Sequence, residues 1–337
     1  MNRSKLLTHY VQKFFQDYLK AHRGLSSNTI LGYRDAIKLF LAFLSKHTRS
    51  HISKLSLDDL SAENALAFLN DVEKTRHCSV ATRNLRLSAL RSFFEYLITQ
   101  DTLHAGQYQR VISIPLKQSS HRMMEYLEVR EVKAVLDCID RKVAPGRRDY
   151  ALLNFLHNTG ARVQEACDLR IENIHFEPLP LVTITGKGCK TRQVPLWPET
   201  ASLLKSYIAE HGPLMDPLNN VFINARGQSL TRFGIRYIIK TRIAAAAVHC
   251  PSLAKKKVGP HTFRHTTAMH LLQSGVDLTV IKNWLGHVSL DTTHAYVEID
   301  LDMKRKALSS CAPAGNIGNL QHLIKQNNDI ICWLESL

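Results

Sequence analysis

Four short segments in the second half of the chain carry side chains that could act together on a phosphodiester. They read TGARVQE at 159–165, GKGCKTR at 186–192, HTFRH at 261–265 and LGHVSLDTTHAY at 285–296. The planar donor fork of an arginine fits the nonbridging oxygens of a phosphate. A lysine can protonate a leaving oxygen, a histidine can donate hydrogen bonds or move protons, and a tyrosine beside cations can become a nucleophile.

Each segment alone also fits a purely structural explanation. Arg162 near a helix start could be a surface residue, and the lysines of the second segment could belong to a basic turn. His261 and His265 have the i, i+4 spacing of a zinc site. A threonine replaces the glutamate of a zinc-hydrolase motif there, however, and Arg264 would place a cation beside the metal. A lone tyrosine such as Tyr296 is normally a core or surface aromatic.

Taken together, the four segments describe one reaction. Arg162 and Arg264 would hold the phosphate, Lys187 would protonate the leaving oxygen, and Tyr296 would attack the phosphorus. The resulting phosphotyrosine stores the energy of the phosphodiester, so the strands can rejoin without ATP. Because the protein itself supplies the cations, the reaction needs no divalent metal and no cofactor.

The order and context of these residues resemble the tyrosine recombinase family, which includes phage integrases and Xer-type recombinases. The matching motifs are T-G-A-R-x-x-E, G-K-G-x-K-x-R-x-V-P, H-x-x-R-H and L-G-H-x-S-x-x-T-T-x-x-Y, and the resemblance extends over about residues 1–308. It implies six catalytic residues, namely Arg162, Lys187, His261, Arg264, His287 and Tyr296. It also implies a helical core-binding domain followed by a mixed α/β catalytic domain.

The resemblance assigns a role to each residue. Two arginines clamp the phosphate, Lys187 acts as general acid on the 5′-hydroxyl, and Tyr296 forms a 3′-phosphotyrosyl bond. His261 and His287 assist proton transfer and orient the transition state. Two further polar residues of the motifs, Glu165 and His265, are expected to support these catalytic groups without contacting the phosphate, Glu165 by orienting a guanidinium.

Charge and composition independently point to a nucleic acid. The 337 residues include 44 Lys and Arg against 29 Asp and Glu, a net charge of +15, and such an excess favours a polyanionic partner. The apolar runs are shorter than the ~20 residues that span a bilayer, and the N-terminal residues lack the pattern of a signal peptide. Seven scattered cysteines indicate reduced thiols. We therefore expect a cytoplasmic protein without membrane contact, associated with the nucleoid when it acts.

The sequence predicts a mainly α fold with a small β-sheet that would position these residues. The expected parts are a helical DNA-clamp domain at 1–105, a linker at 106–125, a catalytic domain at 126–310 and a tail at 311–337. Hydrophobic periodicity predicts helices at about 6–18, 30–44, 80–98, 127–139, 147–158, 162–169, 199–211 and 231–248, another after Ser61, and more helix up to about 307. Two strands at 181–185 and 192–196 would flank a hairpin tip that carries Lys187.

Basic residues outside the catalytic set are candidates for contacts with the DNA backbone. They are Arg83, Arg86 and Arg91 on the polar side of the helix at 80–98, and Lys190 and Arg192 near the hairpin tip. A solvated basic face would have the same sequence pattern.

The resulting hypothesis is a recombinase that acts on duplex DNA at a specific site, with four protomers assembled on two sites. A related recombinase is a further candidate partner. Integration or excision of a mobile element is the first hypothesis, and resolution of replicon dimers is the alternative. A catalytically inactive accessory protein, a type IB topoisomerase-like enzyme and a metal-dependent nuclease are further alternatives. The apolar spacing of the tail, from Ile317 to Leu334, predicts a helix that packs either on a neighbouring protomer or on its own domain.

Overall fold

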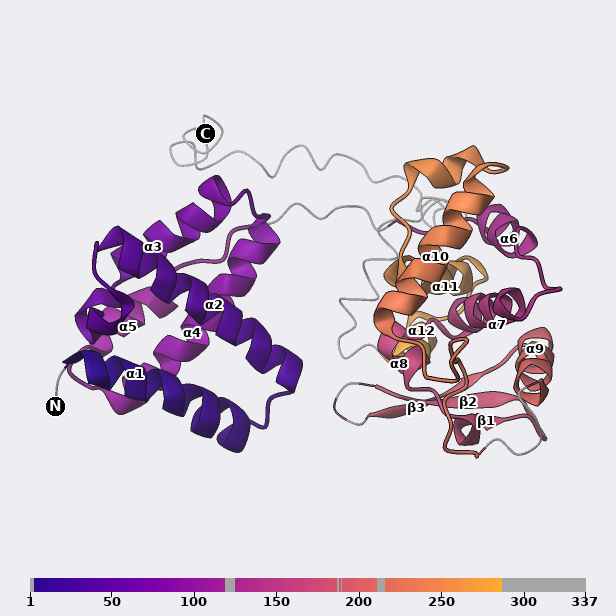
Figure 1. Ribbon diagram of the computed structural model, residues 1–337, viewed down its shortest axis with the longest axis horizontal. Coiled ribbons are helices and arrows are strands. Elements are labelled where there is room, and N and C mark those ends of the chain that lie inside the picture. The colour runs from indigo at the N-terminus through magenta and orange to yellow at the C-terminus, as the bar shows by residue number, and fades with distance from the viewer. Residues whose placement is uncertain (1–2, 119–124, 187, 189, 211–215, 287–337) are drawn as a thin grey trace, which may run out of the picture. The chain divides into compact units, whose positions relative to one another are not determined.

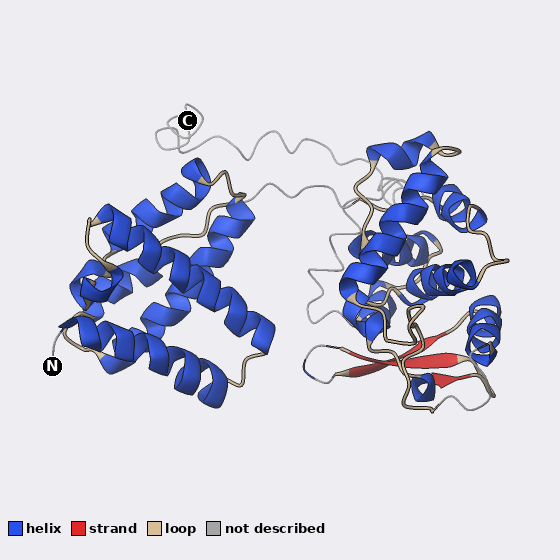
Figure 2. Cartoon of the chain, in the orientation of Figure 1, coloured by secondary structure: helices blue, strands red, loops and turns tan. Residues whose placement is uncertain are grey.

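A computed structural model describes residues 3–118, 125–186, 188, 190–210 and 216–286. The chain divides into two compact units, Met1–Arg122 and Met123–Leu337 (Figures 1 and 2). Three predicted catalytic residues, Lys187, His287 and Tyr296, lie outside the described residues, as does the tail at 311–337.

The described part of the N-terminal unit is built from helices alone. They are α1 (Arg3–Lys13), η1 (Phe14–His22), α2 (Ser27–His47), η2 (Ile52–Lys54), η3 (Leu57–Asp59), α3 (Ala62–Asn70), η4 (Asp71–Thr75), α4 (Val80–Gln100) and α5 (Ala105–Ile112). Serine caps fix two of the starts, because Ser61 and Ser79 accept hydrogen bonds from the backbone N–H groups of Asn64 and Thr82. Aromatic side chains fill the core, including Phe14, Phe40, Phe68, Phe93, Phe94 and Tyr108.

Helix α5 corrects the prediction of a linker that starts at 106. Tyr108 and Val111 of α5 are fully buried against the core of the N-terminal unit, and Ile114 beyond the helix is 5% exposed. The Tyr108 hydroxyl also donates a hydrogen bond to Asp101 Oδ2 at 2.8 Å. The apolar residues of α5 span only one helical turn, so their periodicity was too short to detect.

The C-terminal unit places helices around a small sheet. Its helices are α6 (Val129–Asp137), α7 (Ala144–Thr159), α8 (Val163–Cys167), η5 (Ile171–Asn173), α9 (Pro198–Ala209), α10 (Arg232–Ala247), η7 (Pro251–Lys255), α11 (Pro260–Gln273) and α12 (Leu278–Leu285). One apolar core joins α7 to the sheet, with Leu152 and Phe155 in the same cluster as Val182, Ile184 and Val194.

The sheet has three antiparallel strands in the order β1 (Ile174–His175), β2 (Leu181–Thr185), β3 (Thr191–Pro195). The predicted hairpin is present, and its register pairs Val182 with Val194 and Thr185 with Thr191. Strand β1 was not predicted, since two residues carry no recognisable alternation. The prediction of a mainly helical chain with a small sheet is confirmed.

Among the described helices, none combines the length and the hydrophobicity needed to cross a bilayer.

Candidate active site

Arg162 is positioned by a tight turn between α7 and α8. Helix α7 ends at Thr159 and is capped by Gly160, which has the left-handed conformation with φ 59°. A side chain there would be strained by this φ, and a Cβ would lie 2.5 Å from Leu285 Cδ2. The turn therefore requires glycine, and it delivers Arg162 to the N-cap of α8.

Glu165 holds both the backbone and the side chain of Arg162. Its Oε2 accepts a hydrogen bond from the Arg162 backbone N–H at 2.8 Å, and its Oε1 accepts one from Arg162 Nη1 at 2.8 Å. Burial alone would raise the pKa of Glu165, but the hydrogen bond and charge of Arg192, together with the hydrogen bonds from Arg162, lower it to about 2. The carboxylate is therefore ionised at neutral pH, as its predicted supporting role requires.

Arg264 reaches the same turn from α11. The residue is 3% exposed, and its Nη1 donates to the carbonyl oxygen of Gly160 at 2.7 Å, while its Nη2 donates to that of Leu285 at 2.5 Å. Arg162 Nη2 lies 3.4 Å from the carbonyl oxygen of Gly286, the next residue. Both arginines thus converge on the Gly160 turn and the end of α12.

His261 lies beside these arginines, in the first turn of α11. Partial desolvation of the ring, followed by the charges of Arg264, Arg162 and Arg236, lowers the pKa of His261 below its usual range. The imidazole is therefore neutral at pH 7. A neutral ring can accept a proton from a reacting group, which the predicted role in proton transfer requires.

His265 follows one helical turn later and is half-buried. Burial, then the neighbouring His261 and Arg264, lower the pKa of His265 to about 4. Within the described residues, the structure contains no group of three or more His, Cys, Asp or Glu side chains able to hold a metal ion.

A half-buried pair of histidines attaches α11 to α7. His157 Nε2 and His270 Nδ1 are 3.0 Å apart, and His270 Nε2 lies 2.9 Å from the carbonyl oxygen of Leu127. Because the carbonyl can only accept, His270 Nε2 carries a proton, and the neutral His270 Nδ1 accepts from His157 Nε2–H. Leu127 also donates its backbone N–H to Thr266 Oγ1 at 2.9 Å. Helix α11, which carries His261 and Arg264, is therefore held both by α7 and by the backbone of Leu127.

The hairpin residues take different positions. Lys190 is exposed, and its carbonyl oxygen accepts the Gly186 backbone N–H at 2.8 Å near the tip. The side chain of Arg192 is only 10% exposed, and its guanidinium binds Glu165 and the carbonyl oxygen of Trp284. This placement contradicts the prediction that Arg192 presents its charge to DNA.

The arginines of α4 are also less exposed than the sequence predicted. Arg83 is 4% exposed and donates to the carbonyl oxygen of Pro115 at 3.1 Å, and Arg91 donates to that of Ile114. Arg86 is half-exposed. The chain segment after α5 covers this side of α4, so the prediction of a polar outer face is wrong for Arg83. The sequence could not indicate this cover because α5 itself was not predicted.

Helix α10 presents a basic and aromatic face that the sequence interpretation missed. Arg232, Arg236 and Lys240 recur at four-residue spacing and are exposed, and Phe233 and Tyr237 are 76% and 71% exposed. This spacing was the available signal, since i, i+4, i+8 positions share one helical face. The same face borders a groove of about 640 Å³ that extends to His261. We call Arg232, Phe233, Arg236, Tyr237 and Lys240 the α10 face.

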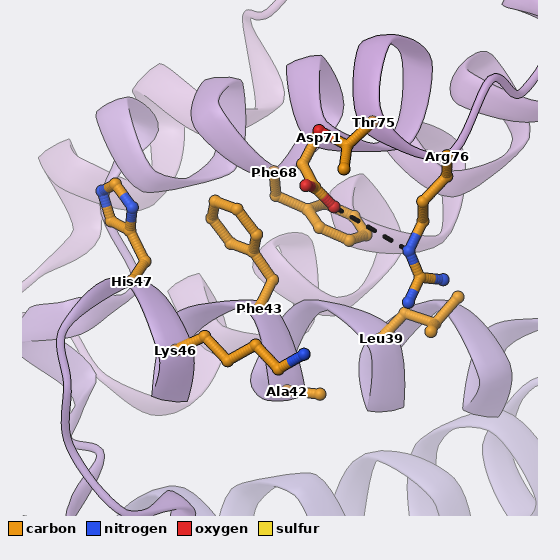
Figure 3. A pocket seen from close by; sticks show the side chains of 9 residues that line it. All are labelled: Leu39, Ala42, Phe43, Lys46, His47, Phe68, Asp71, Thr75 and Arg76. Carbon is orange, nitrogen blue, oxygen red and sulfur yellow. Dashed lines mark ion pairs between the residues drawn. The ribbon is translucent and has the colours of Figure 1, made fainter.

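The N-terminal unit has a separate hollow of about 460 Å³ between α2 and the α3–η4 segment (Figure 3). The rings of Phe43 and Phe68 lie 5.7 Å apart in it, and Arg76 Nε lies 3.8 Å from Asp71 Oδ2 at its side. The lining includes none of the residues that the sequence predicted for chemistry or DNA contact.

Comparisons with known proteins cover both units. The sequence profile of the phage integrase family matches residues 125–302, and that of the phage integrase N-terminal SAM-like domain matches residues 12–101. The putative integrase/recombinase y4rC of Sinorhizobium fredii is 35% identical over 337 residues, 100% of both chains. The tyrosine recombinase XerC of Anoxybacillus flavithermus is 30% identical over 301 residues, 88% of this chain and 95% of the relative. The XerH site-specific recombinase, solved in a post-cleavage complex with palindromic difH substrate, matches with a TM-score of 0.69 and 26% identity, over 86% of this chain and 81% of that one.

Proposed function

This chain belongs to the phage integrase family of tyrosine recombinases, and we propose that it breaks and rejoins duplex DNA at a specific site through a 3′-phosphotyrosyl intermediate. The observation that carries the proposal is the convergence of Arg162, Arg264 and His261. Arg162 precedes the hairpin and lies 99 or more positions before His261 and Arg264, which follow it, yet both arginines contact the Gly160 turn or the end of α12, and both lower the pKa of His261.

This arrangement suits a phosphodiester in its transition state. The guanidinium groups of Arg162 and Arg264 supply fixed positive charge and planar donors to the nonbridging oxygens, where negative charge develops. His261, neutral at pH 7, can hydrogen-bond to the phosphate or accept a proton beside it. Fixed donors need no reorganisation during the reaction, so they stabilise the transition state more than water does.

The covalent step uses residues of the family motif that lie outside the described residues. The phenolic oxygen of Tyr296 attacks the phosphorus and forms the P–O bond, and the bond from phosphorus to the 5′-oxygen breaks. The phenolic proton passes to a neighbouring base, with His261 and His287 as candidates. Lys187 gives a proton to the leaving 5′-oxygen. Rejoining is the reverse reaction with a 5′-hydroxyl of the partner strand.

Contacts with the DNA backbone are proposed at basic residues of both units that are exposed or half-exposed. Lys190 beside the hairpin tip and Arg86 on α4 remain candidates. The cationic residues of the α10 face join them, because the groove beside this face extends to His261. Exposed aromatic side chains next to cations are suited to contacts with bases and sugars.

The biological role is proposed to be integration or excision of a mobile element, with replicon-dimer resolution as the alternative. Similarity to a putative integrase/recombinase over the whole chain supports the first role. We further propose four protomers on two DNA sites, cytoplasmic action at the nucleoid, and a protomer contact made by the tail at 311–337. A related recombinase could replace two of the four protomers.

Covalent trapping on nicked duplexes tests the proposal. The duplexes are tiled from the DNA that flanks the gene, and wild type is compared with Tyr296→Phe in EDTA on a denaturing gel. We expect an adduct with wild type that is absent with Tyr296→Phe. An adduct that persists in the variant contradicts the proposed nucleophile, and DNA binding without any adduct favours an inactive accessory protein. Adduct formation that EDTA abolishes favours a metal-dependent enzyme.

A further inference from the structure

We propose that Arg192 is a positioning residue for Arg162: acting through Glu165, it fixes the direction of the Arg162 guanidinium and leaves this cluster with a net positive charge. The inference rests on the proposed function, because that function gives Arg162 the task of binding the phosphate. It replaces the DNA contact that the sequence predicted for Arg192.

Arg192 connects three elements of the C-terminal unit. It lies in β3 opposite Ile184 of β2, and its Nη1 and Nη2 donate to Glu165 Oε1 at 3.2 Å and to Oε2 at 2.7 Å. Its Nε donates to the carbonyl oxygen of Trp284 at 2.9 Å. Each guanidinium nitrogen therefore has a partner within the protein, and Arg192 ties β3 to α8 and to the end of α12.

Both oxygens of Glu165 are shared between the two arginines. Oε1 accepts from Arg162 Nη1 as well as from Arg192 Nη1, and Oε2 accepts from the Arg162 backbone N–H as well as from Arg192 Nη2. The Glu165 side chain is 4% exposed, so it cannot turn toward water without leaving its partners. The direction of Arg162 consequently depends on where Arg192 holds the carboxylate.

The charges of this cluster leave an excess for a ligand. Glu165 facing Arg162 alone would form a neutral pair, and its negative charge would oppose a phosphate at close range. Arg192 adds a second positive charge, so the three side chains together carry a net charge of +1. The side chain of Arg162 is 36% exposed and that of Arg192 is 10% exposed. Arg192 therefore compensates the charge of the Glu165 carboxylate, and Arg162 stays accessible to the phosphate.

The turn after α12 packs directly on Arg192. Gly286 has φ 66°, and a Cβ at this position would lie 3.1 Å from Arg192 Cδ and 3.3 Å from Arg192 Nη1. The carbonyl oxygen of the same glycine lies 3.4 Å from Arg162 Nη2. A shift of Arg192 would therefore also shift a turn that contacts Arg162.

The first experiment monitors the environment of the Arg162 side chain by NMR in the absence of DNA. Full-length protein with ¹⁵N-labelled arginine is compared as wild type, Arg192→Lys, Arg192→Gln and Arg242→Lys, and the Nε–H signal of Arg162 is identified by its absence in Arg162→Lys. Arg242 is the matched control, because it is 23% exposed and pairs with the buried Asp149 at 2.6 Å. We expect the Arg162 signal to move in both Arg192 variants and to stay in the control. A signal that is unchanged in Arg192→Gln overturns the proposal.

The second experiment separates chemistry from binding on the nicked duplex that gives the Tyr296-dependent adduct. We expect single-turnover cleavage to slow about 100-fold in Arg192→Gln, as when one fixed donor is lost, and about 10-fold in Arg192→Lys, which restores only the charge. DNA affinity should change less than about twofold, since backbone contacts elsewhere dominate it. Arg162→Lys combined with Arg192→Gln should cleave no more slowly than Arg162→Lys alone.

The outcomes distinguish this inference from the proposed function. Cleavage at the wild-type rate in Arg192→Gln, or a lower yield of folded protein with an unchanged rate, overturns the positioning role only. An adduct that persists in Tyr296→Phe overturns the proposed function, and the ¹⁵N experiment then still decides whether Arg192 positions Arg162.

Discussion

Arg264 Nη1 donates to the carbonyl oxygen of Gly160 at 2.7 Å, which fastens α11 to the turn that precedes Arg162. Its second hydrogen bond, to the carbonyl oxygen of Leu285, fastens α11 to the end of α12. A residue that joins two turns in this way serves the fold as well as the phosphate. The loss of Arg264 should therefore affect stability and chemistry together.

Replacement of Arg264 by lysine tests this double role. A lysine cannot reach both carbonyl oxygens with a planar fork, so two buried acceptors lose their donors. We expect Arg264→Lys to lower the free energy of unfolding by about 2 kcal/mol and to slow cleavage by about 100-fold in the folded fraction. Urea denaturation and single-turnover adduct formation measure the two effects. The exposed Arg226→Lys serves as control, and a variant equal to it in both assays would refute the double role.

The half-buried pair of His157 and His270 predicts loss of stability toward acid. Burial, then the nearby His270, lower the pKa of His157 to about 4, below the ~6.5 of an unfolded chain. The unfolded state thus binds more protons between these values, and the stability present above pH 6.5 is lost as the pH falls toward 4. We expect wild type to lose about 2 kcal/mol more between pH 7 and pH 5 than His157→Gln does. Equal pH dependence of the two proteins, measured by urea denaturation, would contradict this assignment.

Helix α5 should contribute to the stability of the N-terminal unit. Tyr108 is fully buried and hydrogen-bonded, whereas Leu103 just before the helix is 89% exposed. Tyr108→Ala should therefore lower the free energy of unfolding by about 4 kcal/mol, as large-to-small changes in a core do, while Leu103→Ala should change it by less than about 0.5 kcal/mol. If residues 105–112 were a solvated linker, both variants would unfold at the wild-type urea concentration.

The α10 face should contribute to DNA affinity through backbone phosphates. Arg236→Gln removes one cation, so the slope of log affinity against log salt should become shallower by about 1. Lys205→Gln on α9 is the control, because this exposed lysine lies over the Phe176 ring and outside the proposed contacts. Fluorescence anisotropy with the nicked duplex, titrated at several salt concentrations, measures the slope. A slope for Arg236→Gln equal to that of the control would contradict a contact between the α10 face and the DNA backbone.

Local patterns were sufficient to predict most elements of the fold. The helix start after Ser61 follows from the serine itself, the helix at 80–98 follows from its apolar spacing, and the hairpin follows from two β-rich runs around a glycine-rich turn. Such features depend on residues within a few positions of one another. Helix α5 and strand β1 were missed because one apolar turn and two residues respectively are too short to show a period.

The site was predictable only as a set of residue types. The sequence places Arg192 two residues after Lys190 in a basic turn, which suggests a DNA contact for both. The structure separates them, because Glu165, 27 positions earlier, binds Arg192 from another element. A partner this distant leaves no pattern in a single sequence, and the same holds for Arg83, whose acceptor is 32 positions later.

The identity of the residue that carries the DNA tests the central claim most directly. The adduct formed by wild type on a nicked duplex is digested with nuclease and protease, and the peptides are sequenced by mass spectrometry. The account predicts a nucleotide joined by its 3′-phosphate to Tyr296, with no modified peptide from Tyr296→Phe. A nucleotide attached to any other side chain, or an unmodified Tyr296 peptide in protein that has cleaved the DNA, would contradict it.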